Sequence, residues 1–327
     1  MNHEAKNFYS SLTHVVGPIA LQNFISAAVN AADVFMLGFL GQTAIAASSL
    51  AGNVGFILFM VCTGLSSGLI MLCAQYWGKK DIESIKTIVG IAMRICATVG
   101  IVFGLISAIC PQFFMRIFTS DISLINTGSL YLRAASVAFI CQSFSQIFQA
   151  GFKSIERVKI VTITSTTTLF LNIGLNAIFI FGPLGAPKLG IFGVGLATSI
   201  ARVVELVICI IYAYSQKHVK ITFSVLFRRN KYLTLDFIKC SMPAVGNELV
   251  WGAAFSMYSV ILGHLGEDIV AANSVVNTVR QLVSVLFFGM AYGGAIVIGK
   301  HIGKGEKELA ERNASRLASS TIFAGVI

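Results

Sequence analysis

The chain has 327 residues, of which 56% are hydrophobic and only 12% are charged, and its mean hydropathy is +0.81. Soluble domains carry about 25% charged residues, so this chain has too little polar surface to face water on all sides. The composition therefore excludes an ordinary soluble domain and indicates membrane-spanning helices. No basic stretch leads into a small-residue cleavage site, so we expect no removable signal peptide.

Eight apolar runs reach the roughly 20 residues that a spanning helix needs. In chain order they lie near 14–39, 49–74, 88–110, 126–148, 160–183, 192–214, 238–263 and 274–298. A ninth run begins near 317. The sequence therefore predicts an all-α polytopic membrane protein with about eight complete spans and the start of a ninth.

The lysines and arginines are distributed unevenly between the two sides of the predicted membrane. If the N-terminus is cytoplasmic, 18 of the 24 fall on the cytoplasmic side. The outer connections hold only Arg116 and Lys188, and four more lie within spans: Arg94, Arg133, Arg202 and Arg280. This positive-inside pattern accounts for the net charge of +10 and disfavours a nucleic-acid surface. We expect a multi-pass protein of the cell (inner or plasma) membrane with a cytoplasmic N-terminus.

The sequence matches itself without gaps at an offset of 225 residues. The matched pairs include Pro18 with Pro243, Gly38 with Gly263, Gly64 with Gly289, Gly68 with Gly293 and Gly78 with Gly303. The offset covers six spans, so both copies enter the membrane in the same direction and are expected to flank a central site. We predict an N-terminal lobe at 1–216, a cytoplasmic connection at 217–237 and an incomplete lobe at 238–327. A complete repeat predicts twelve helices, so we expect the chain to be a fragment that is inactive alone.

Four segments in order resemble the signatures of one transporter family. They are ADVFMLGFLGQTAIAA, fourteen residues after Pro18; AQYWGKKDIESIK; LNIGLNAIFIFGPLGAPKLGIFGVGLATSIAR; and SMPAVGNELVWG. With the repeat, the chain resembles multidrug and toxic-compound extrusion (MATE) transporters over nearly its whole length. The resemblance implies a two-lobed bundle that exports amphipathic, often cationic, compounds in exchange for H⁺ or Na⁺, with no other cofactor.

Ionisable groups at membrane depth are functional candidates because they are costly there. Asp33 lies in the first span, and four oxygen-bearing residues in later spans share its predicted depth in the outer half of the membrane: Tyr131, Asn172, Asn176 and Thr198. In the family, the matching positions form the cation site of the N-terminal lobe. Some members carry Asp at the position of Asn176. The site here then has one carboxylate fewer, so the choice between H⁺ and Na⁺ as the coupling ion stays open. The alternative is a structural role. Asp33 would then form an ion pair with Arg133 or a hydrogen bond to a neighbouring helix, and the amides of Asn172 and Asn176 would hold helices together by hydrogen bonds.

Three further predictions concern the remaining polar residues of the spans. Glu248 lies near the predicted midplane of the seventh span and is a second coupling or substrate-binding candidate, or else a hydrogen-bonded core residue. Pro18 is a candidate hinge. Arg202 and Glu205 are three residues apart on one helix and are expected to form a structural ion pair.

No nucleotide-binding G-x-x-x-x-G-K-[ST] motif, zinc-protease motif or paired-carboxylate arrangement occurs in the sequence. Seven scattered cysteines show no metal-ligand spacing, so no metal is expected beyond Na⁺ near Asp33. We predict an ion-driven antiporter for small organic cations, not an enzyme, monomeric and independent of nucleotides. The alternative is a lipid-linked or polysaccharide flippase of the same architecture; a membrane-embedded enzyme or a receptor is less favoured.

Overall fold

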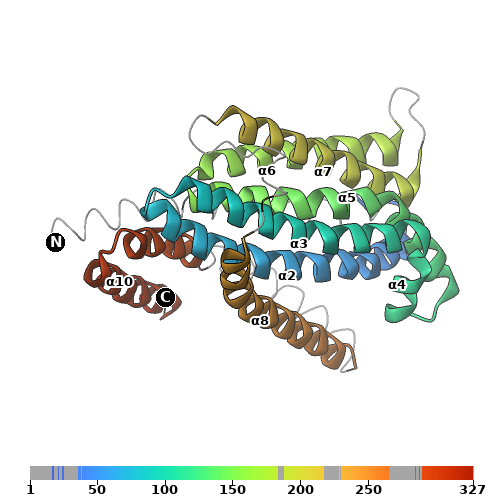
Figure 1. Cartoon of the computed structure of the whole chain (residues 1–327). Coiled ribbons are helices and arrows are strands. Elements are labelled where there is room, and N and C mark those ends of the chain that lie inside the picture. Colours follow the sequence, from blue (N-terminus) through green and yellow to red (C-terminus); the bar gives the residue numbers. More distant parts are fainter. Residues whose placement is uncertain are drawn as a thin grey trace.

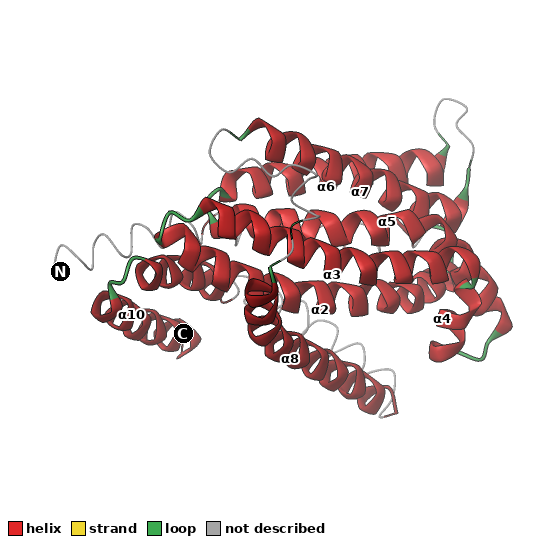
Figure 2. Ribbon diagram, in the orientation of Figure 1, coloured by secondary structure: helices red, strands yellow, loops and turns green. Residues whose placement is uncertain are grey.

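In the computed structural model of this chain, every regular element within the described residues is an α-helix (Figure 2). The structure describes residues 39–182, 188–216, 230–264 and 289–326, together with positions 17, 21, 24, 25, 36, 37, 228, 284 and 287. Pro18 and Asp33, and most of the predicted spans at 14–39 and 274–298, lie outside the described residues.

The helices correspond closely to the predicted spans. They are α2 (Gln42–Gly78), α3 (Ile82–Ile109), α4 (Pro111–Phe118), α5 (Ile122–Ser154), α6 (Val158–Phe181), α7 (Gly190–Ser215), α8 (Lys231–His264) and α10 (Lys307–Val326), and residues 289–303 are also helical. Among the described residues, α2, α3, α5, α6 and α7 are long and apolar enough to cross a membrane. The prediction of an all-α membrane fold is confirmed.

Three helices differ from the sequence-based expectation. α8 begins at Lys231, seven residues before the predicted span and inside the connection predicted at 217–237. α4 was not predicted, because its eight residues are far shorter than a hydropathy window of about 19 residues. α10 begins at Lys307, ten residues before the run predicted near 317. Its first half is strongly polar and carries no hydropathy signal, whereas Glu308 in the first turn favours a helix start by complementing the helix dipole.

Short polar motifs fix several helix boundaries. Asp81 caps α3 by accepting a hydrogen bond from the Ser84 amide at 3.0 Å, and Asp121 caps α5 by accepting one from the Ser123 amide at 2.7 Å. α6 ends at Gly182, whose left-handed φ of 65° suits a glycine. These boundaries set the depth of each side chain along the bundle.

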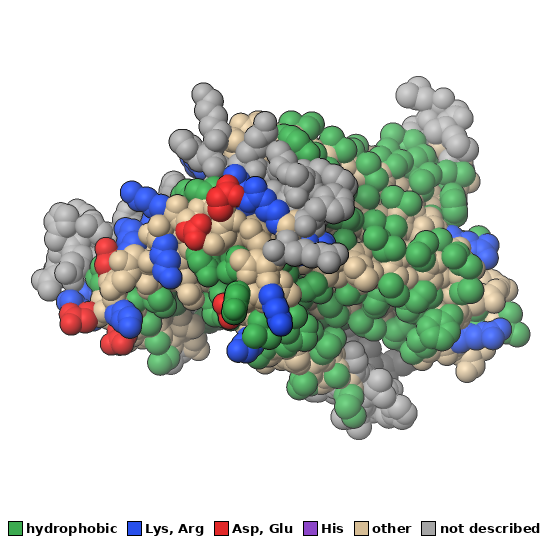
Figure 3. Space-filling model, viewed as in Figure 1, with side chains coloured by type: hydrophobic (Ala, Val, Ile, Leu, Met, Phe, Trp, Pro, Cys, Tyr) green, Lys and Arg blue, Asp and Glu red, His purple; other side chains and the backbone are tan. Residues whose placement is uncertain are grey.

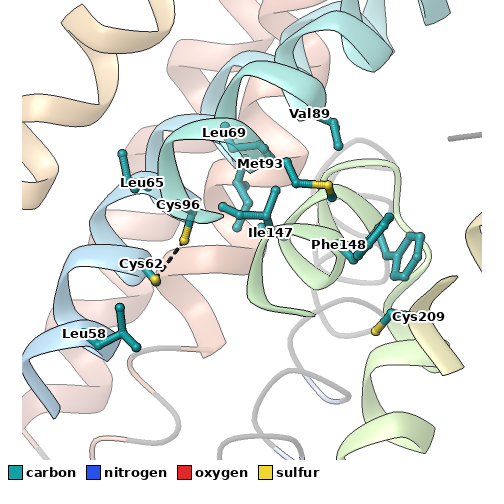
Figure 4. Packing of buried hydrophobic residues seen from close by; sticks show 14 of the residues in the cluster. Leu58, Cys62, Leu65, Leu69, Val89, Met93, Cys96, Ile147, Phe148 and Cys209 are labelled. Atoms are coloured by element: carbon teal, nitrogen blue, oxygen red, sulfur yellow. Dashed lines mark hydrogen bonds between the residues drawn. The ribbon is translucent and has the colours of Figure 1, made fainter. Parts of the chain in front are cut away.

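α5 lies at the centre of the bundle and packs against α2, α3 and α7, while α6 packs mainly against α7 (Figure 1). Leu58, Leu69 and Ile147 are fully buried in the shared core (Figure 4). Small residues allow the helices to approach closely, as is common in membranes: a Cβ atom on Gly104 of α3 would lie 2.9 Å from the Ser136 carbonyl oxygen of α5. All seven cysteines, each within the described residues, are free thiols.

The predicted repeat is visible in the backbone. After α2, Lys80 adopts a left-handed φ of 61°, and the following amide donates to the Tyr76 carbonyl oxygen at 3.0 Å. At the offset of 225 residues, Gly305 adopts a φ of 84°, and the following amide donates to the His301 carbonyl oxygen at 3.1 Å. The same turn therefore ends the second helix of each repeat.

The second repeat contacts the first mainly through α2. α8 leaves the bundle at a steep angle (Figure 1), and it packs against two glycines of α2. A Cβ atom on Gly64 would lie 2.7 Å from the Val245 amide nitrogen, and one on Gly68 would lie 2.8 Å from the Ser241 Cα. Glycine at both positions is therefore what allows the two helices to cross so closely.

Charged side chains gather at one end of the molecule. In Figure 3 both acidic and basic side chains cover the end that carries α10 and the turn after α2, whereas the end that carries α4 shows mainly apolar surface with a few basic side chains on this face. This distribution agrees with the predicted placement of the lysine-rich turns on one side of the membrane.

Candidate cation-coupling site

A chain of buried polar side chains joins α6 to α7. Asn176 Nδ2 donates to Asn172 Oδ1 at 3.2 Å, and Asn172 Nδ2 donates to Thr198 Oγ1 at 3.5 Å. Asn172 is 2% exposed and Asn176 is fully buried. Three of the predicted site residues, Asn172, Asn176 and Thr198, therefore lie together.

This polar chain continues a buried stripe on one face of α6. Thr164 and Thr168 precede Asn172 and Asn176 at four-residue spacing, and both are buried. Their hydroxyls donate to carbonyl oxygens of their own helix at 2.8 Å, so these two groups are satisfied locally. The Asn172 amide, by contrast, donates to Thr198 of α7, and amide and hydroxyl oxygens are of the kind that suits H⁺ or Na⁺.

Tyr131 on α5 lies beside the same region. Its ring is partly buried and packs on the small apolar cluster that contains Leu37, Ile180 and Val194. Ile180 lies one turn from Asn176, and Val194 accepts the Thr198 hydroxyl at 3.0 Å. Met36 and Leu37 pack in this cluster too, which places the end of the first predicted span next to the polar chain.

Glu248 occupies a separate location on α8. It is partly buried, and it lies close enough to Tyr292 for its charge to act on that phenol, which shares a hydrogen bond with Ser67 of α2. The Lys153 ammonium group stands 5.7 Å from the centre of the Tyr292 ring. Within the described residues, Glu248 therefore lies near Tyr292, a residue of its own repeat that reaches Ser67 of the first, and it takes no part in the Asn172 hydrogen bonds.

Arg202 and Glu205 form the ion pair expected from their spacing. Arg202 NH1 lies 2.7 Å from Glu205 Oε2, and the Glu205 side chain is only 4% exposed. Gln149 of α5 donates to the other carboxylate oxygen at 2.6 Å. With both oxygens engaged, this carboxylate ties α7 to α5.

Sequence reasoning missed Gln149, Lys153 and Tyr292. Lys153 was assigned to a cytoplasmic connection. Gln149 and Tyr292 lie in apolar runs and were not predicted as site residues. Their partners lie on other helices, so no spacing in the sequence reports the contacts. No group of three or more His, Cys, Asp or Glu residues suited to a metal ion is found in the described part of the chain.

Comparison with known proteins identifies the family. The MatE family model matches residues 18–178 and 243–327, which together make up most of the chain. The two matched segments begin 225 residues apart, at Pro18 and Pro243, which is the offset of the internal repeat. The chain belongs to the MatE family of transporters.

Curated relatives carry related names. The chain is 24% identical over 303 residues to the probable multidrug resistance protein YoeA of Bacillus subtilis, covering 91% of this chain and 65% of that protein. It is 24% identical over 301 residues to the multidrug resistance protein NorM of Vibrio cholerae, covering 90% of this chain and 65% of that protein. The chain thus spans slightly less than two thirds of the length of these relatives.

Solved structures share the fold. An outward-facing multidrug resistance MATE family transporter of the MOP superfamily superposes with a TM-score of 0.86 at 18% identity, covering 97% of this chain and 70% of that one. A MOP superfamily transporter from Pyrococcus furiosus, described as having a binding pocket of reversed polarity that suggests a different function, gives a TM-score of 0.85 at 18% identity, with the same coverage. These similarities confirm the two-lobed MATE-type bundle.

Proposed function

We propose that the protein is a cation-coupled antiporter that exports amphipathic, often cationic, organic compounds by alternating access. Membership of the MatE family and the multidrug resistance names of its relatives support the transport of small compounds. The observation that carries the proposal is the contact between two repeats of one fold, since paired repeats that rock about a shared site are the usual basis of alternating access.

The proposed coupling site lies in the first lobe. Asp33 and Tyr131 supply the ionisable and phenolic oxygens, and Asn172, Asn176 and Thr198 supply a hydrogen-bonded chain between α6 and α7. Met36 and Leu37 pack beside this chain, and Leu37 lies four residues beyond Asp33 in the sequence. Binding of H⁺ or Na⁺ neutralises the Asp33 carboxylate and changes the position of the first span, with Pro18 as its hinge.

Contacts between the repeats close the end of the bundle that carries α10 and the turn after α2. This is called the lysine-rich end. Lys300 Nζ lies 2.8 Å from both carboxylate oxygens of Glu156, and each side chain is about one third exposed. A partly exposed ion pair is worth about 0.2–1 kcal/mol, whereas one charge that crosses 100 mV releases about 2.3 kcal/mol. The free energy released by one such charge therefore exceeds that of this ion pair, which is one of the contacts that separate on opening toward the cytoplasm.

Ethidium efflux tests the proposed function. Cells that express the full-length gene are loaded with ethidium in buffers with and without sodium, beside cells that express its Asp33→Asn variant and cells with an empty vector. We expect efflux that requires Asp33, and its dependence on sodium identifies the coupling ion. Absence of efflux above the empty vector contradicts the drug-antiporter proposal and favours the flippase alternative.

A further inference from the structure

A hollow of about 490 Å³ lies where α3, α4 and α5 meet, away from the coupling site. Its lining comes from the end of α3, from α4 and from one residue of α5: Ile109, Cys110, Pro111, Gln112, Phe113, Arg116, Ile117 and Arg133. Within the part of the chain that the structure describes, the lining comes from the first repeat alone, which separates the hollow from the contact between the repeats.

α4 is anchored on one face and exposed on the other. Met115 is fully buried and contacts α5 at Gly128. Phe113 and Ile117, on the opposite face, are 59% and 63% exposed. Because Pro111 starts this helix directly after α3 ends, the chain turns at once and holds α4 against the outer part of the bundle.

Arg133 lies at the level of this short helix. Gly104 of α3 faces the Ser136 carbonyl oxygen, which sets the register between α3 and α5. Arg133 is three residues nearer the α4 end than Ser136, or about 4.5 Å along α5. This places its Cα within about one turn of the end of α3 at Ile109, so that its guanidinium group can reach the membrane interface.

The hollow combines positive charge with exposed apolar surface. Arg116 and Arg133 are both exposed, and neither has an ion-pair partner among the described residues. None of the described residues that line the hollow is acidic. The apolar surface extends down α3 and α5 from the hollow, through Ile109, Leu105 and Leu130, which are 70%, 50% and 48% exposed.

We propose that this hollow binds an anionic phospholipid, with Arg116 and Arg133 around the phosphate and the acyl chains along α3 and α5. Basic pockets between membrane helices recognise anionic headgroups in this way. A free phosphate would use the two arginines but not the adjoining apolar surface, whereas a phospholipid uses both. On the predicted orientation of the chain, the lipid belongs to the outer leaflet.

Quenching by brominated lipids tests this proposal. Phe113 lines the hollow and is exposed, so Phe113→Trp places a fluorescent reporter in it, and the protein without this change gives the background of its two native tryptophans. The reporter protein is reconstituted in phosphatidylcholine vesicles that contain brominated phosphatidylglycerol or brominated phosphatidylcholine. We expect stronger quenching by phosphatidylglycerol, with a preference of roughly five-fold for each arginine.

Arginine variants determine whether the headgroup contact is responsible. Arg116→Gln with Arg133→Gln should abolish the preference, and each single change should remove part of it. Lys188→Gln is the matched control, because Lys188 is an exposed cation before α7 that does not line the hollow. Thermal unfolding in phosphatidylcholine alone verifies that the variants are folded.

Three results would overturn the proposal, two of them from quenching alone. One is equal quenching by the two brominated lipids in the reporter protein. The other is a preference for phosphatidylglycerol that survives in the folded single and double arginine variants. Inorganic phosphate at millimolar concentration should leave the lipid preference unchanged, and full competition by phosphate would show that the site holds a free anion instead of a lipid.

Discussion

Gly78 and Gly303, which occupy the same position in the two repeats, face each other where α2 meets the 289–303 helix. A Cβ atom on Gly78 would lie 3.0 Å from the Cα of Gly303, and one on Gly303 would lie 2.7 Å from the carbonyl carbon of Gln75. Equivalent residues come together in this way only near the axis that relates the repeats. The pair therefore marks that axis at the lysine-rich end.

The first prediction concerns this glycine pair. Gly303→Ala forces a methyl group against backbone atoms, which cannot move aside as a flexible side chain can, so we expect a loss of about 1–3 kcal/mol in the stability of the contact. Thermal unfolding in detergent measures it. Gly52→Ala in α2 is the control, because a Cβ atom there would meet nothing within 4 Å. Equal melting temperatures for the two variants would contradict the close approach.

The second prediction concerns the ion pair that joins the repeats beside these glycines. Glu156→Lys places two cations together, and Lys300→Glu places two carboxylates together, so each change alone should lower efflux and melting temperature. The double exchange restores opposite charges and should recover most of both. A double variant no better than the worse single variant would show that the two groups do not act as a pair.

The third prediction separates coupling from helix packing at the Asn172 chain. Asn172→Leu removes the amide between Asn176 and Thr198, and hydrogen bonds between membrane helices contribute only about 0.6 kcal/mol on average. We therefore expect a small change in melting temperature but a fall of roughly ten-fold or more in ion-driven efflux, about 1.4 kcal/mol or more in the coupled step. Thr168→Val, a buried neighbour on the same face of α6, should leave efflux intact. A matched loss in both variants would favour a purely structural role.

The fourth prediction concerns the buried carboxylate of α7. Arg202→Met leaves Glu205 with Gln149 alone in a buried position, so we expect a loss of roughly 3 kcal/mol. Adding Glu205→Leu to this variant removes the uncompensated charge and should restore much of the stability. Thermal unfolding of the single and double variants tests this. A double variant less stable than Arg202→Met would contradict the assignment.

The spans and the repeat could be predicted from sequence because both depend on local signals. Apolar length located α2, α3, α5, α6 and α7, and counting residues from the ends of the spans placed Asn172, Asn176 and Thr198 at a similar depth. Other features depend on how helices rotate and pack. The partnership of Glu205 with Gln149, and that of Lys300 with Glu156, join residues 56 and 144 positions apart, which no local pattern reports. α4 was missed because eight residues give no hydropathy signal.

The measurement that tests alternating access most directly is a reversible cross-link across the lysine-rich end. Glu156→Cys and Lys300→Cys are combined in a protein whose seven native cysteines have been replaced, and the two thiols are joined by a short bifunctional methanethiosulfonate. The proposal predicts that ethidium efflux stops on cross-linking and returns when a reductant cleaves the link, while either single cysteine variant is unaffected. Efflux that continues in fully cross-linked protein would show that the repeats need not separate here, and would contradict the account.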